Sequence, residues 1–273
     1  MTDIFSSLEK FGISDILKNE VAAEVTREAT NMAALKAREP KEAKEEKVDL
    51  DKYIFSKKFD CPCCNFEFSS YVPKDKRARL EKIDFDLRPV YTPVDPLFYD
   101  IVLCPMCGWA ALRSLFDRIK KDQISAIHQK ISPSFRYHEY PKELDADMAI
   151  ERYNMALVNT LVKGGSSGEK AYTFMKLNWL YRMKENTEAQ SQFSALALKN
   201  FMEALEKEHM PIMGLGHDTI SYIVGVLNLS LGNKEEGFKS MSEVIISKTS
   251  SERLKEMARD IKNGLLQIPS LTT

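Results

Sequence analysis

Apolar side chains recur at intervals of three and four residues throughout the C-terminal half of the chain, from about residue 143. This period places them on one face of an α-helix, and glycine-containing turns such as "KGGSSG", "MPIMGLG" and "LGNK" interrupt it. The pattern predicts six amphipathic helices, near residues 143–163, 168–186, 188–209, 216–231, 234–247 and 250–266. Because the connecting loops are short, we expect the helices to stack as antiparallel hairpins.

One part of this helical region resembles the tetratricopeptide pattern. In "LGNKEEGFKSMSEVI", residues 231–245, a turn glycine precedes a charged helix start, a small residue, and an aromatic and aliphatic stripe. Gly237 stands where alanine is usual, and the hairpins are longer than the usual repeat of about 34 residues. We therefore predict tetratricopeptide-like hairpins, with an irregular helical bundle as the alternative.

The first part of the chain has a different pattern. Apolar residues at helical spacing lie on both sides of Gly12 and continue to about residue 38. Residues 36–52, "KAREPKEAKEEKVDLDK", are charged, nearly free of large apolar side chains and interrupted by Pro40. This composition is typical of a solvated linker.

The spacing changes to that of short strands between Lys57 and about Met106. The segments "KKFDC", "FEFSSYV" and "FYDIVLC" are separated by turns rich in Pro, Asp and Lys, which predicts a small β-rich module. After Cys107, the segment "GWAALRSLFDRIKKDQISAIHQKI" has helical spacing. We expect a helix to begin directly there.

Five cysteines lie within this β-rich section, in two tight groups. Cys61 with Cys64, and Cys104 with Cys107, have the two-residue spacing that lets both sulfurs of a pair reach one ion. Four thiolates form a closed tetrahedron, which is typical of a structural zinc site and leaves no position for a substrate. We predict zinc on these four residues; iron in a rubredoxin-like centre is the alternative. Residues 65–103 must then form a hairpin or loop that brings Cys104 back beside Cys64.

Cys63 is the spare cysteine, because a residue adjacent to Cys64 cannot direct its sulfur at the same ion. We interpret it as a small turn residue, with a redox role or a role as alternative ligand as the other reading. A thioredoxin-like dithiol is disfavoured, since strand alternation continues through Phe66 and Phe68 where that motif should open a helix. A helix directly after Cys107 would stabilise that thiolate through its dipole, as in a treble clef.

Together these patterns predict a mainly α protein with a small β-rich zinc-binding module and tetratricopeptide-like antiparallel helical hairpins in its C-terminal half. The expected divisions are a helical extension and linker at 1–52, the zinc-knuckle module with its following helix at 53–140, the helical domain at 141–268, and a tail at 269–273.

The charges of the chain nearly balance, with 39 Lys and Arg against 40 Asp and Glu, so the molecule has no overall field that attracts nucleic acid or anionic membranes. A local basic group beside the first cysteine pair is a candidate for nucleic-acid contact, although neighbouring acids favour a solvated loop: Lys74, Lys76, Arg77 and Arg79. The chain has no signal-peptide pattern, and no apolar run approaches the roughly 18 residues that span a bilayer. We expect a cytoplasmic protein with no membrane partner.

No arrangement typical of a catalytic site emerges. The segment "GGSSGEK" lacks the glycine and the Ser or Thr that flank the lysine of a phosphate-binding loop, and we predict a turn between helices. The histidines lie apart, without ligand or triad spacing: His128, His138, His209 and His217. We expect a non-enzymatic protein that binds another protein through its helical region. Nucleic-acid association, and redox or iron chemistry, are the alternatives.

These motifs resemble a bacterial family known as domain of unknown function 2225. The resemblance covers about residues 58–247 and rests on "CPCCNFEF", "IDFDLRPVYTPVDPLFYDIVLCPMCGWA", "NWLYRM" and "YIVGVLNLSLGN". It implies tetratricopeptide-like helices after a four-cysteine knuckle pair, which this chain carries as Cys61, Cys64, Cys104 and Cys107. The chain departs from the family pattern, without losing a ligand, at Cys63, at Trp109 where tyrosine is commoner, and at Gly237. The resemblance implies no activity.

Overall fold

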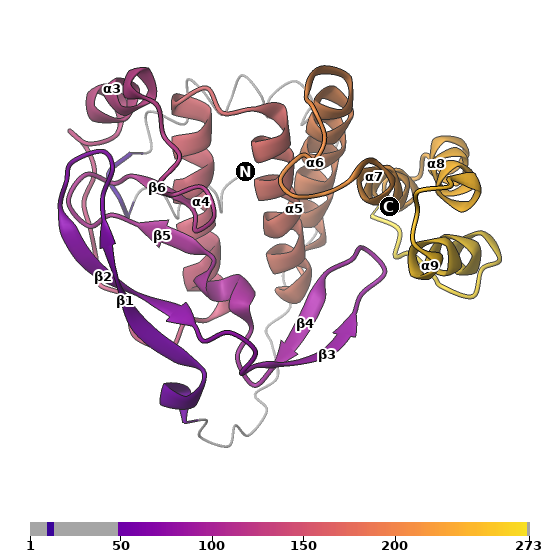
Figure 1. Cartoon of the computed structure of the whole chain (residues 1–273), viewed down its shortest axis with the longest axis horizontal. Coiled ribbons are helices and arrows are strands. Elements are labelled where there is room, and N and C mark those ends of the chain that lie inside the picture. Colours follow the sequence, from indigo (N-terminus) through magenta and orange to yellow (C-terminus); the bar gives the residue numbers. More distant parts are fainter. Residues whose placement is uncertain (1–9, 14–48, 272–273) are drawn as a thin grey trace. The chain divides into compact units, whose positions relative to one another are not determined.

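The computed structural model describes residues 10–13 and 49–271 (Figure 1). The rest of the predicted N-terminal extension lies outside the described residues. The chain divides into two compact units. Of the described residues, the first unit contains those up to Glu81 together with Tyr91–Gly165, and the second contains Lys82–Val90 together with those from Ser166 onward. The predicted helical domain begins at residue 141, whereas the helical part of the second unit begins at Ser166.

Two short antiparallel hairpins build the β-rich part of the first unit. Strand β1 (Ile54–Asp60) pairs with β2 (Glu67–Pro73), and β5 (Ile101–Leu103) pairs with β6 (Ala110–Leu112). The strands predicted before and after the first cysteine pair, and before the second, are thereby confirmed. The turn of each hairpin contains one of the two cysteine pairs.

The prediction of a helix directly after Cys107 is wrong. Ala110–Leu112 forms β6, and the helix α3 (Lys121–Lys130) begins only later. All three residues of β6 are buried, and the strand packs against α4 (Ala146–Val162) as well as pairing with β5. Burial on both sides of this strand thus decides the local structure over the helical spacing of the segment. The Cys107 thiolate therefore does not lie at a helix N-terminus.

Helix α4 supplies the helical face of the first unit. The side chain of Asp145 accepts a hydrogen bond from the backbone N–H of Met148 and caps the start of this helix. The helix packs on β5, β6, α3 and the short 3₁₀ helix η3 (Pro96–Tyr99). A second 3₁₀ turn, η2 (Leu50–Lys52), precedes β1. Aromatic rings fill the space behind the first hairpin: Phe59, Phe68, Trp109 and Phe116.

The second unit consists mainly of consecutive helices: α5 (Ser167–Met183), α6 (Thr187–Lys207), α7 (His217–Ser230), α8 (Lys234–Ile246) and α9 (Glu252–Lys262). Each helix packs on the next one in the chain. With α4, they confirm the six helices predicted from the apolar spacing. No helix in the described part of the chain is long and apolar enough to cross a membrane. The tetratricopeptide-like assignment itself stays a prediction.

Two glycines explain why α7 and α8 lie so close together. A Cβ atom on Gly225 would lie 3.2 Å from the carbonyl oxygen of Gly237, and a Cβ on Gly237 would lie 2.5 Å from Cγ of Leu229. Real side chains do not approach so closely without a shift of their neighbours. The glycine at position 237, where alanine is usual in the repeat pattern, is therefore required by the packing of this helix pair.

A third hairpin joins β3 (Arg79–Ile83) to β4 (Pro89–Thr92). Its tip, Lys82–Val90, belongs to the second unit. There the hydroxyl of Tyr222 in α7 donates a hydrogen bond of 2.8 Å to the carbonyl oxygen of Phe85. The hairpin tip is thus part of the packed core of the helical unit.

Candidate metal centre

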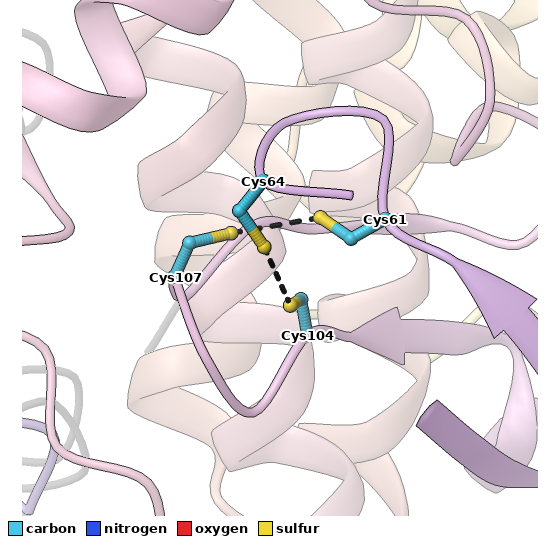
Figure 2. Close-up of side chains that lie close together, drawn as sticks. All are labelled: Cys61, Cys64, Cys104 and Cys107. Carbon is cyan, nitrogen blue, oxygen red and sulfur yellow. Dashed lines mark hydrogen bonds between the residues drawn. The ribbon is translucent and has the colours of Figure 1, made fainter. Parts of the chain in front are cut away.

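The four predicted cysteines converge on one point of the first unit (Figure 2). Their sulfur atoms all lie within 4.8 Å of one another. Sγ of Cys61 lies 3.6 Å from Sγ of Cys107, and Sγ of Cys64 lies 3.7 Å from Sγ of Cys104. Zinc–sulfur bonds of about 2.3 Å in a tetrahedron place neighbouring sulfurs about 3.8 Å apart. The donor set therefore fits a single tetrahedral ion.

The first cysteine pair is held by two backbone hydrogen bonds. The N–H of Cys61 donates to the carbonyl oxygen of Phe66 over 3.1 Å, and the N–H of Asn65 donates to the carbonyl oxygen of Cys61 over 2.8 Å. Asn65 has a φ of 58°, a conformation that asparagine adopts more readily than most residues. The turn closes so that the side chains of Cys61 and Cys64 face the same point.

The second pair repeats this geometry. The N–H of Cys104 donates to the carbonyl oxygen of Trp109 over 2.8 Å, and the N–H of Gly108 donates to the carbonyl oxygen of Cys104 over 3.2 Å. Gly108 has a φ of 76° and is thus the counterpart of Asn65. Asn65 is not among the predicted site residues, although both turns share one order that could have revealed it: cysteine, proline, any residue, cysteine, asparagine or glycine, and an aromatic residue.

Side chains from the helical part of the first unit hold the backbone of both turns. Nε2 of His128 lies 2.8 Å from the carbonyl oxygen of Cys63. The hydroxyl of Ser132 donates to the carbonyl oxygen of Cys107 over 2.8 Å, and Nδ2 of Asn159 donates to that of Gly108 over 3.0 Å. The spacing of His128, Ser132 and Asn159 in the sequence gave no sign of this supporting role. These contacts fix the turns relative to α3 and α4.

The cluster is largely shielded from water. Cys61, Cys104 and Cys107 are buried, and Cys64 is partly exposed. Hydrogen bonds from Cys104 and Cys107 lower the pKa of Cys61, whereas hydrogen bonds to Cys104 and Cys61 raise the pKa of Cys107. One thiolate is thus stabilised by neighbours that keep their protons. Thiolates this close together repel one another, so a cation that compensates their charge favours loss of the thiol protons.

Cys63 does not belong to the set of four. Its side chain is buried. It occupies the position in the first turn that the exposed Met106 occupies in the second turn. A hydrogen bond with Cys107 lowers its pKa, but the influence of Cys61 and burial outweigh this and raise the pKa of Cys63 to about 12. A thiol that keeps its proton at neutral pH is a poor nucleophile, which agrees with a role as a packed turn residue.

The basic group proposed for nucleic-acid contact is only partly assembled. Lys74 and Arg77 line an open pocket together with Asp51, Lys52 and Tyr53. Nζ of Lys74 is already engaged by the carbonyl oxygen of Asp51 at 2.6 Å. The other two members of the group do not line this pocket: Lys76 lies in the turn before β3, and Arg79 lies within β3, 3.7 Å from Glu81.

The segment "GGSSGEK" forms the predicted turn at residues 164–166 and continues into the first turn of α5. The carboxylate of Glu208 accepts hydrogen bonds from the backbone N–H of Gly168 at 2.7 Å and from the hydroxyl of Ser166 at 3.1 Å. A Cβ atom on Gly168 would lie 2.2 Å from Cγ2 of Ile212. The N-terminus of this helix is thus closed by a side chain of the protein itself.

A family model described as "Uncharacterized protein conserved in bacteria (DUF2225)" matches residues 54–265. The chain belongs to this family. An uncharacterized protein of Borreliella burgdorferi (strain ATCC 35210 / DSM 4680 / CIP 102532 / B31) is 23% identical to this chain in an alignment that covers 76% of this chain and 88% of that protein. No solved structure matches the chain. The resemblance seen in the sequence motifs is thereby confirmed.

The matched region of this DUF2225 protein contains both cysteine pairs and the helices α4 to α9. Among the described residues, the four cysteines form a group that can hold a metal ion. The geometry fits tetrahedral coordination in which the protein supplies every ligand.

Proposed function

We propose that this DUF2225 protein is a non-enzymatic, cytoplasmic zinc protein whose helical region serves as a scaffold for another protein. The observation that carries the proposal is the convergence of four cysteine sulfurs within 4.8 Å of one another. Zinc is the proposed ion, with iron as the alternative, because zinc is the common occupant of sites with four cysteines and needs no redox partner.

The role proposed for zinc is that of a cross-link between two hairpins that are distant in the sequence. The β5–β6 hairpin has only three residues in each strand, and an isolated two-stranded hairpin is marginally stable at best in water. A structural zinc site contributes on the order of 10 kcal/mol to folding. The ion would therefore stabilise the first unit as a ribbon-like pair of knuckles.

Exposed apolar side chains on the second unit support the scaffold role. Met202 on α6 is 49% exposed, Phe238 on α8 is 38% exposed, and Ile246 at the end of α8 is 79% exposed. Amphipathic helices or extended peptides of partner proteins commonly cover such side chains on helical repeat surfaces. We propose that a protein segment of this kind binds along the second unit.

Native mass spectrometry with elemental analysis tests the metal assignment. We expect one zinc ion per chain in protein purified without chelator, loss of this ion in Cys104→Ser, and its retention in the matched control Cys63→Ser. Iron in the wild-type protein would overturn the zinc assignment. A metal-free wild-type protein that is fully folded would overturn the structural role.

In-cell cross-linking followed by affinity purification tests the scaffold role. We expect a bacterial protein to be recovered with the wild-type chain and to be lost with Ile246→Glu, which places a charge on the exposed apolar side chain. Lys248→Glu, which changes a charged side chain nearby, is the control and should keep the partner. Recovery of the same proteins with the wild-type chain and Ile246→Glu would contradict a partner site on the second unit.

The second candidate, nucleic-acid association, is favoured by one observation. Three cations, Lys52, Lys74 and Arg77, line the open pocket beside η2. Binding of single-stranded RNA or DNA through these residues should weaken steeply with salt, because each phosphate contact releases counterions. Measurement of affinity at two salt concentrations, with Lys74→Glu as the variant, tests this. Absent or salt-insensitive binding would remove the candidate.

A further inference from the structure

A short N-terminal segment, Lys10–Ile13, packs in the first unit against residues that lie more than one hundred positions later in the sequence. Phe11 is 0% exposed and Ile13 is 1% exposed. The ring of Phe11 lies 5.9 Å from that of Phe135 and 4.9 Å from that of His138, measured between centroids. The two apolar side chains of the segment are therefore as buried as any in the core.

Polar contacts fix the direction of the segment. The backbone N–H of Arg136 donates a hydrogen bond of 2.9 Å to the carbonyl oxygen of Phe11. The ammonium group of Lys10 pairs with the carboxylate of Glu151. Nε2 of His138 lies 3.3 Å from an oxygen of the same carboxylate, and the hydroxyl of Tyr140 donates a hydrogen bond of 3.4 Å to that oxygen. A basic residue at the first position thus meets an acidic group that neighbouring residues hold in place.

Gly12 is required by both conformation and space. It has a φ of 73°, and a Cβ atom there would lie 2.5 Å from the carbonyl oxygen of Ser134. No other residue type fits that position without displacing the backbone. The segment thus presents a basic, an aromatic, a glycine and an aliphatic residue, in that order, to a surface that includes Phe135, His138 and Glu151, called the docking surface below.

The docking surface packs against the second cysteine turn. A Cβ atom on Gly108 would lie 2.6 Å from Cγ of Phe135 and 3.1 Å from Cγ2 of Ile131. Ser132, between these two residues, donates its hydroxyl hydrogen bond to the carbonyl oxygen of Cys107. The aromatic platform under Phe11 is thus positioned by the same turn that carries a cysteine of the metal centre.

We infer that the docking surface recognises a basic–aromatic–glycine–aliphatic segment, and that Lys10–Ile13 occupies it as a detachable linear motif that the same sequence can replace when it is supplied as a separate peptide. The contacts are those of a short linear motif: one backbone hydrogen bond, one ion pair and two apolar side chains. The side chain of Lys10 is 59% exposed, so solvent reaches the ion pair. This inference goes beyond the proposed function, because it concerns a docking surface in the first unit, whereas the proposed scaffold site lies on the second unit.

Fluorescence anisotropy with a labelled peptide tests the inference. The peptide has the sequence of residues 6–15, "SSLEKFGISD", and the protein is the full zinc-loaded chain carrying Phe11→Ala. We expect saturable binding to this variant, and binding at least about tenfold weaker to the wild-type chain, because the tethered segment competes at an effective concentration in the millimolar range. The matched peptide with Gly12→Ala should bind at least about tenfold more weakly to the variant, since glycine alone fits there.

A second substitution tests the recognition of the basic residue. Adding Glu151→Gln to the Phe11→Ala chain should weaken binding of the parent peptide about fivefold, but should leave a peptide with Lys10→Ala unaffected. Phe11→Leu, which keeps more of the apolar volume, replaces Phe11→Ala if the latter does not fold and hold zinc.

Three results would overturn the inference. In the first, the folded variant binds no peptide. In the second, it binds the parent and Gly12→Ala peptides equally well. Either result would mean that the docking surface does not recognise this sequence. Alternatively, the variant binds the peptide but the wild-type chain does not bind it even at millimolar concentration, and then Lys10–Ile13 is a permanent part of the core. None of these results depends on the partner site proposed for the second unit, so the two proposals fail separately.

Discussion

Arg182 links the tip of the third hairpin to α5 within the second unit, and its replacement gives a quantitative test of the structure. Its guanidinium binds both carboxylate oxygens of Asp86 and lies 3.0 Å from a carboxylate oxygen of Asp84. The guanidinium carbon also lies 4.9 Å from the centroid of the Phe85 ring. One cation thus holds two acidic side chains and one aromatic ring of the hairpin tip.

The expected cost follows from the exposure of these groups. The side chains of Arg182, Asp84 and Asp86 are 18%, 15% and 10% exposed. Arg182→Met keeps the length and apolar contacts of the side chain but leaves two carboxylates largely desolvated. Breaking a buried ion pair in this way costs about 3–5 kcal/mol. Asp84 keeps contacts with Lys82 and Arg88, so we expect the lower limit, about 3 kcal/mol.

A double-mutant cycle separates the ion pair from the packing. Asp86→Asn removes the charge from the partner, and the combined variant should be less destabilised than the sum of the two single variants. For residues in direct contact, the interaction energy typically lies at about 0.5–3 kcal/mol. Arg253→Met, at an exposed position of α9, is the control and should change the free energy of unfolding by less than about 0.5 kcal/mol.

The two tryptophans of the chain allow each unit to be followed by itself. Trp109 lies in the first unit and Trp179 in the second, and both are buried. In a Trp109→Phe background, urea unfolding monitored by fluorescence reports on the second unit through Trp179. A cost of Arg182→Met below about 1 kcal/mol, or an interaction energy near zero, would refute the conclusion that these ion pairs anchor the hairpin tip.

Three further predictions concern the metal centre, the α7–α8 contact and the partly buried Tyr140. Cys104→Ser should lose zinc and the native fluorescence of the first unit, whereas Cys63→Ser should keep both, as elemental analysis and fluorescence will show. Gly237→Ala forces a Cβ to 2.5 Å from Cγ of Leu229, so urea unfolding should show a net loss of about 1 kcal/mol despite the better helix propensity of alanine. Burial raises the pKa of Tyr140 above its usual value of about 10; the unfolded chain therefore loses this proton first, and the free energy of unfolding should fall as pH rises above about 10. Tyr140→Phe should flatten this pH dependence in equilibrium unfolding; an unchanged slope would contradict it.

Local spacing in the sequence was sufficient to predict the helices α4 to α9 and the four candidate metal ligands. The apolar period of three and four residues predicted α4 to α9, because each of these helices buries apolar side chains against other elements of its own unit. The two-residue spacing of the cysteines identified the four sulfurs that converge, because a metal ion needs both members of each pair in one turn.

Long-range packing decided the features that the sequence analysis did not find. Ala110–Leu112 has helical spacing but forms a strand, since β5 and α4 lie on its two sides. Asn65 looks like an ordinary turn residue until its φ of 58° is compared with that of Gly108. The burial of Phe11 depends on Phe135 and His138, which lie so far along the chain that no local pattern relates them.

The same long-range contacts indicate what the metal ion stabilises. If the two cysteine turns formed an independent finger, their backbone carbonyls would be directed to solvent. Instead, Nε2 of His128 contacts the carbonyl of Cys63, and Ser132 and Asn159 bind the carbonyls of Cys107 and Gly108. These contacts couple both turns to the helical part of the first unit, so an ion bound by the cysteines would stabilise that helical part as well. By linkage, removal of the ion should destabilise α3 and α4 together with the turns, and the whole first unit should unfold as one.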